Sequence, residues 1–89
     1  MDENELIEAL DKIRNEAMVN PCISPSQAEH KYLLIINYAR QLLPFLADSS
    51  KMGKLIQITE PYVTNRDKNY DDVYVLCTNV LETWNECKK

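Results

Sequence analysis

Residues 24–46 read SPSQAEHKYLLIINYARQLLPFL, and this stretch decides the fold that we expect. Ser24 is a candidate helix cap, Pro25 suits the first helical position, and Gln27 completes a capping box. Apolar residues then recur at alternating spacings of four and three, which is typical of one face of a helix. These residues are Ala28, Tyr32, Ile35, Ala39, Leu42 and Leu46. We therefore predict a long central helix that begins at Pro25.

Further apolar residues make this central segment hydrophobic on most sides. They are Leu33, Leu34, Ile36, Tyr38, Leu43 and Phe45. A narrow polar strip remains, formed by His30, Asn37 and Gln41. A helix that is apolar on most faces has to be buried by several neighbours. The segment should therefore lie at the centre of the domain, with other helices around it.

Pro44 falls inside the apolar pattern of the central segment. Proline lacks a backbone donor and its ring clashes with the carbonyl of the residue four positions earlier. Two outcomes are open: a kink with the helix continuing to about Asp48, or a break followed by a short new turn from Pro44. We expect the kink, because Phe45 and Leu46 continue the apolar pattern.

Two more segments share the alternating spacing of four and three. The first is predicted to span residues 3–19, because Asp2 and Glu5 have capping-box spacing and Asn20 precedes a proline. Its apolar stripe comprises Leu6, Leu10, Ile13 and Ala17. The second should run from Asn65 or Asp67 to Cys87. Its stripe comprises Val73, Cys77, Val80, Trp84 and Cys87.

The segment from Ser50 to Thr64 fits two structures. Met52, Leu55, Ile56 and Thr59 have helical spacing, whereas the runs LIQIT and YVT have strand-forming residue types. A hairpin would have to turn at Pro61, and proline cannot supply the positive φ of a two-residue hairpin turn. We therefore predict a short helix over 50–59.

Together these patterns predict an all-α fold in a single domain, residues 1–89. The chain has one glycine, too few for the many tight turns of an all-β domain. The shared spacing of four and three is typical of helices that cross at about 20°. We expect a small antiparallel bundle of three to four helices around the kinked central helix.

The composition limits the cellular compartments and the classes of partner that we expect for this protein. Fourteen acidic and ten basic residues give a net charge of −4, which makes nucleic-acid binding unlikely. Only Lys51, Lys54, Arg66 and Lys68 form a candidate basic cluster. No apolar run reaches the ~18–20 residues that span a bilayer, and no signal peptide is recognisable. Three cysteines without a C-x-x-C pair also suit a reducing compartment. We expect a cytoplasmic protein from a bacterium or phage that does not bind a membrane.

No constellation of residues predicts catalysis, a metal site or a cofactor. His30 is the only histidine and has no adjacent nucleophile or base, so it should lie on the surface. Cys77 and Cys87 belong to the apolar stripe, where a free cysteine acts as a small hydrophobe. Cys22 lies in a loop, and its reactivity stays open. With one glycine, the chain cannot contain a glycine-rich phosphate loop. We expect no enzymatic activity.

Two features point to partner binding. The central helix has more apolar surface than two other long helices can cover, so part of the set Leu34, Tyr38 and Phe45 should stay exposed and bind a protein. Alternatively, the 50–59 helix and the residues around Pro61 close over this set. The second feature is the segment 62–74, where tyrosine and arginine are typical of binding hot spots. Its candidates are Tyr62, Arg66, Tyr70 and Tyr74, unless Tyr70 and Tyr74 pack in the core.

The sequence thus predicts a small acidic protein–protein interaction module that acts by stoichiometric binding to a protein target. Inhibitor, immunity-type and adaptor or chaperone roles fit this description. The alternative is a self-assembling subunit that dimerises through the central helix. In size, acidity and helical content the chain is similar to bacteriocin immunity proteins and phage-encoded host inhibitors. That likeness is one of shape, carried by no run of residues, and shape alone does not establish function.

Overall fold

The computed structural model of the chain describes residues 1–20, 24–64 and 73–88. Every regular element in these ranges is helical, and none is a strand. The elements are α1 (Glu3–Val19), α2 (Pro25–Leu42), the 3₁₀ helix η1 (Leu43–Phe45), α3 (Ser49–Thr64) and α4 (Val73–Cys87). The all-α prediction is therefore confirmed for the described residues.

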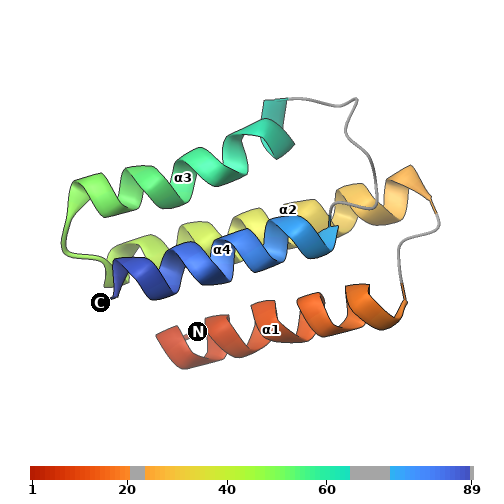
Figure 1. Ribbon diagram of the computed structural model, residues 1–89, viewed down its shortest axis with the longest axis horizontal. Coiled ribbons are helices and arrows are strands. Elements are labelled where there is room, and N and C mark those ends of the chain that lie inside the picture. The colour runs from red at the N-terminus through yellow and green to blue at the C-terminus, as the bar shows by residue number, and fades with distance from the viewer. Residues whose placement is uncertain (21–23, 65–72, 89) are drawn as a thin grey trace.

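The four α-helices pack against each other with α2 and α4 at the centre (Figure 1). Helix α1 lies along one side of this central pair and α3 along the other. Helices α2 and α4 also contact one another directly. We expected a single central helix, whereas α2 and α4 occupy the centre together.

One continuous apolar core joins the four helices. Helix α1 contributes Leu6, Leu10 and Ile13; α2 contributes Ala28, Tyr32, Ile35, Ala39 and Leu42; and α4 contributes Val73, Leu76, Cys77, Val80, Leu81, Trp84 and Cys87. Leu46 and Leu55 complete it. The apolar spacings of the three long segments predicted most of these positions.

Two helix starts follow the predicted capping residues. The Asp2 carboxylate accepts a hydrogen bond from the backbone N–H of Glu5 at 2.8 Å. The Ser24 hydroxyl accepts one from the N–H of Gln27 at 3.3 Å, with Pro25 in the first helical turn. Each cap satisfies a donor that the first turn of a helix leaves unpaired. Helix α1 spans the predicted residues, and α2 begins where predicted.

The kink expected at Pro44 is wrong, because α2 ends at Leu42. The N–H of Leu43 bonds the carbonyl of Arg40, which is the acceptor that an α-helical residue 44 would have used. The chain tightens into η1, and the N–H of Leu46 bonds Leu43 O at 3.0 Å. Leu46 itself is extended. A local 3₁₀ turn thus accommodates the proline, and the helix does not continue to Asp48.

Helix α3 settles the ambiguous segment as helix, and it is longer than the predicted 50–59. It begins after Asp48, whose carboxylate accepts hydrogen bonds from the N–H of Ser50 at 2.9 Å and from its hydroxyl at 2.8 Å. The hydroxyl bond is the main cause, ahead of the backbone bond, of a lowered pKa at Asp48. The helix continues through Pro61 to Thr64. The predicted start of the last helix, at Asn65 or Asp67, lies outside the described residues.

Candidate functional site

The residues predicted to bind a partner from the central segment are Leu34, Tyr38 and Phe45, which we call the α2 stripe. Leu34 and Tyr38 are half-buried and pack against the core. Phe45 lies in η1 and keeps 40% of its surface exposed. The neighbouring helices therefore cover the stripe in part, and its most accessible aromatic group is at the end where α2 stops.

An ion pair shows which neighbour borders the α2 stripe. Lys31, one turn before Leu34 on the same side of α2, places its ammonium 3.6 Å from the Glu16 carboxylate of α1. Both side chains are partly exposed, so this pair contributes little to stability. It locates the stripe along the boundary between α1 and α2.

The tyrosines of the 62–74 segment have different environments. Tyr62 is half-buried, and its ring centroid lies 5.1 Å from that of Tyr32 in a tilted pair. Tyr74 is 37% exposed at the start of α4, so it is not a buried core residue. Arg66 and Tyr70 lie outside the described residues. Tyr62 therefore packs against the core, whereas Tyr74 is accessible to solvent.

Of the described residues in the two predicted sets, the exposed aromatic side chains Phe45 and Tyr74 are not brought together. Helix α2 ends, and η1 follows, at one end of the bundle, whereas α4 begins at the opposite end (Figure 1). Phe45 and Tyr74 belong to those two ends. A single compact contact patch cannot contain both residues, so the α2 stripe and Tyr74 have to be considered as separate candidates.

Several exposed apolar side chains among the described residues were not predicted as site residues. Met1 precedes α1, and Met18 and Val19 lie in its last turn. Leu33 is 61% exposed, Ile56 41% and Val75 46%. For Leu33 a signal was present, because Glu29 and Asn37 lie one turn before and after it. A position flanked by polar residues at that spacing lies on the solvent side of an amphipathic helix.

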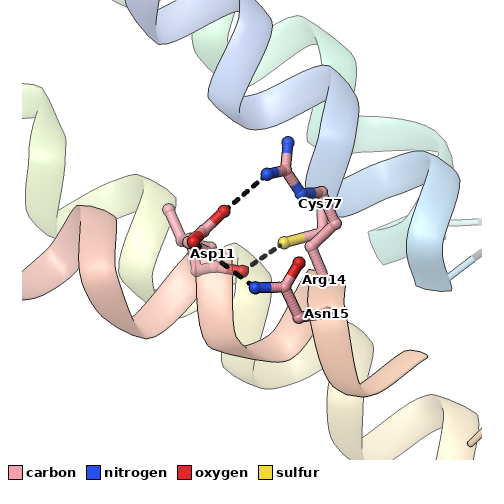
Figure 2. A network of polar contacts seen from close by, with 5 residues as sticks. Asp11, Arg14, Asn15 and Cys77 are labelled. Atoms are coloured by element: carbon pink, nitrogen blue, oxygen red, sulfur yellow. Dashed lines mark hydrogen bonds and ion pairs between the residues drawn. The ribbon is translucent and has the colours of Figure 1, made fainter. Parts of the chain in front are cut away.

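The buried thiol of Cys77 joins α4 to α1 (Figure 2). Its Sγ donates a hydrogen bond to the carbonyl oxygen of Leu10 at 2.8 Å. Burial raises the pKa of Cys77 to about 11, and the nearby Arg14 guanidinium opposes this to a smaller extent. A thiol held in its protonated form is a poor nucleophile. The predicted role of Cys77 as a small core residue is confirmed by its burial.

Around this contact, the polar side chains of α1 interact with each other. Figure 2 shows the Arg14 guanidinium and the Asn15 amide both directed at the Asp11 carboxylate. The Asn15 bond is long, at 3.5 Å. These groups belong to one helix and face solvent beside the buried thiol. They stabilise the surface of α1 locally and do not activate Cys77.

A second thiol links α3 to α4. Cys87 is buried, and its Sγ lies 3.7 Å from the carbonyl oxygen of Lys51. In return, the Lys51 ammonium donates a hydrogen bond to the Cys87 carbonyl at 2.9 Å. A cation at the last carbonyls of a helix is favourable because the C-terminal end carries partial negative charge. This reciprocal contact is specific to the fold, since the two residues are distant in sequence.

The remaining candidates for chemistry or charge recognition are dispersed. His30 is exposed, as predicted. No three His, Cys, Asp or Glu side chains among the described residues are grouped so that they could hold a metal ion. Of the candidate basic cluster, Lys51 binds the Cys87 carbonyl, Lys54 is exposed, and Arg66 and Lys68 are outside the described ranges. Cys22 is also outside them.

None of the helices built from residues 1–20, 24–64 and 73–88 combines the length and the hydropathy needed to cross a bilayer.

Because the pKa of Cys77 is raised in the folded protein, we expect a loss of stability at high pH. The folded pKa of this thiol, about 11, exceeds its ordinary value near 9. Its stabilising contribution is therefore complete below about pH 9 and is lost as the pH rises through 11, by about 3 kcal/mol in total. Urea unfolding at a series of pH values measures this loss.

The matched control for this pH effect is Cys77→Ser. The serine hydroxyl can donate to the Leu10 carbonyl but does not titrate in this range. All other side chains are the same in both proteins, so the difference between the two pH profiles isolates the thiol. Parallel profiles would show that the thiol is not protected from deprotonation in the folded state.

Comparison with known proteins supplies no relative for this arrangement: the chain matches no family model, and neither curated proteins nor solved structures give a significant match.

Proposed function

We propose that this protein acts by stoichiometric binding to a protein target, and that the α2 stripe is its contact surface. The observation that carries this proposal is the exposed ring of Phe45, which continues the half-buried pair Leu34 and Tyr38. Aromatic side chains are enriched in binding hot spots because they bury a large area and lose little conformational freedom. Exposed apolar groups of this kind mark interfaces more often than isolated surface residues do.

The polar residues around the α2 stripe suit the rim of such an interface. Glu16 and Lys31 form their ion pair at its α1 border, and Gln41 is exposed on α2 between Tyr38 and Phe45. Interfaces typically have an apolar centre and a polar, solvated rim. The net charge of −4 would in addition accelerate association with a basic target.

In this proposal the chain works in the cytoplasm as an inhibitor, an immunity-type protein or an adaptor. The connection between α2 and α3 is short, so these two helices are expected to run antiparallel, as neighbouring helices do in a bundle. The binding itself is the activity, so a stable complex with one target per chain is expected and no turnover.

Replacing Phe45 by aspartate should weaken the complex at least tenfold. The substitution removes an apolar contact and places a charge in the interface, which together cost more than the ~1.4 kcal/mol that corresponds to a factor of ten. The partner is first captured from a native lysate on the immobilised protein and identified by mass spectrometry. The affinities of the purified pair are then measured by calorimetry.

Leu33→Asp is the matched control for Phe45→Asp. It introduces the same charge at an exposed leucine on α2, outside the stripe. Circular dichroism should show that both variants are folded. Equal affinity of Phe45→Asp and the unchanged protein would rule out the stripe as the contact surface, and equal losses in both variants would indicate an effect of charge alone.

The second candidate function is self-association through the same stripe. Its support is also the exposure of Phe45, because a symmetric dimer would bury this ring against its copy. Light scattering separates the two candidates. A dimer that becomes monomeric in Phe45→Asp favours self-assembly, whereas a monomer at every concentration leaves binding to another protein.

A further inference from the structure

Helices α1, α2 and α4 pack together as one group. Helix α1 contacts both α2 and α4, and α2 contacts α4, so the three close on one another. Most of the buried apolar side chains belong to them. By contrast, among residues 49–62 of α3, the only apolar side chain that is fully buried is Leu55.

Helix α3 also contains two residues, Gly53 and Pro61, that are unfavourable in the interior of a helix. Gly53 lies inside the helix with open space where a Cβ would stand, so no close packing requires a glycine. Glycine is less favourable than alanine in a helix interior. Pro61 cannot donate to the carbonyl of Gln57, and the helix loses one hydrogen bond there.

The buried polar group of α3 does not attach it to the other helices. Thr59 is 4% exposed, and its hydroxyl donates to the carbonyl of Ile56 in the same helix at 2.7 Å. Such a bond satisfies the hydroxyl whether or not α3 is docked. Contacts with other helices lie near both ends of α3, Lys51 with Cys87 and Tyr62 with Tyr32. Between them Leu55, with the half-buried Met52 and Ile58, packs against the core.

We propose that α3 undocks and unfolds as one cooperative segment, which we call the lid, from a platform of α1, α2 and α4 that stays folded. Proteins open locally in cooperative segments, and the segments with few buried contacts and low intrinsic stability open first. This inference concerns only how α3 is held, and it stands or falls independently of the proposed function.

The chain carries two thiols that report on different openings. Cys87 faces Lys51 of α3, so lifting α3 uncovers it. Cys77 faces Leu10 of α1, so it stays buried until α1 and α4 separate. Pulsed alkylation with iodoacetamide, read by mass spectrometry of each cysteine peptide, measures both. The iodoacetamide concentration is chosen in the range where the alkylation rate is proportional to it. Each alkylation rate then reflects the equilibrium between the closed and the open state.

We expect Cys87 to be alkylated at least tenfold faster than Cys77 in the native protein. Two variants identify the opening responsible. Gly53→Ala should slow the labelling of Cys87 about two- to fivefold, because alanine strengthens α3. Ile13→Val, which loosens the platform in α1, should accelerate Cys77 about two- to tenfold and leave Cys87 unchanged.

Two results would contradict the proposal that α3 opens separately from the other helices. If Ile13→Val accelerates both thiols by the same factor, α3 opens only when the whole domain unfolds. If Gly53→Ala leaves the rate of Cys87 unchanged, the thiol is exposed without movement of α3, for example by fraying of the last turn of α4. Hydrogen exchange of the backbone amides of residues 54–59 provides a second readout, which should follow Cys87 in all three proteins.

Discussion

The Ile35→Asp variant is expected to be unfolded at room temperature. Ile35 is fully buried in α2, at the centre of the core. Removing its side chain costs about 2–5 kcal/mol, and an unpaired charge in its place adds several more. A domain of this size has a total stability of about 5–10 kcal/mol. Far-ultraviolet circular dichroism should therefore show the loss of most helical signal.

The control for Ile35→Asp is again Leu33→Asp, two residues earlier on the same helix. Leu33 is 61% exposed, so its carboxylate remains in water and the protein should keep its helical signal. The comparison holds the helix and the introduced residue constant and varies only burial. A folded Ile35→Asp protein with a cooperative unfolding transition would contradict the central position of α2.

Replacing Trp84 by alanine should lower the free energy of unfolding by about 3–5 kcal/mol. Trp84 is 4% exposed in α4, and its ring packs in the core. The Lys88 ammonium also lies 5.3 Å from its ring centroid, but the Lys88 side chain is 42% exposed, so this contact adds little. Urea unfolding should be followed by circular dichroism, because the variant lacks the only tryptophan.

Val75→Ala provides the matched truncation in the same helix. Val75 is 46% exposed, and its loss should change the free energy of unfolding by no more than about 0.5 kcal/mol. Similar effects of the two substitutions would contradict the structure, in which Trp84 lies on the buried face of α4 and Val75 on its exposed face.

Both bounds of α1, the start of α2 and the buried faces of the two helices were predictable, because the signals that set them are local. Asp2 and Ser24 cap their helices through residues three positions away, and Asn20 precedes the proline that follows α1. The alternating spacing likewise fixes which face is apolar without reference to the rest of the chain. Such features depend only on a few neighbouring residues.

The two prolines show where local reasoning failed. At Pro44 the chain could bend or break, and the outcome depended on whether Arg40 O could be satisfied by Leu43, a matter of backbone geometry. At Pro61 the helix was expected to have ended already. It continues because Tyr62, three residues after the buried Thr59, extends the inner face of α3 to the ring of Tyr32. That contact joins residues far apart in sequence.

The candidate site was less predictable than the fold for the same reason. Which parts of a helix stay exposed depends on where its neighbours lie. Part of the set Leu34, Tyr38 and Phe45 was expected to stay exposed, but which part had no signal: Phe45 is exposed, whereas Leu34 and Tyr38 pack against the core. The thiol contacts of Cys77 with Leu10 and of Cys87 with Lys51 had no signal in the sequence, because neither residue pair is related by a motif.

The pairing of α1 with α4 has a consequence for synthesis on the ribosome. The Leu10 carbonyl receives the thiol of Cys77, and Glu3 lies 3.4 Å from the ammonium of Lys88. Helix α1, which is translated before α4, therefore obtains a principal partner only when α4 has left the exit tunnel. Until then Leu6, Leu10 and Ile13 lack that cover, so a nascent chain stalled before residue 73 should be a substrate for chaperones.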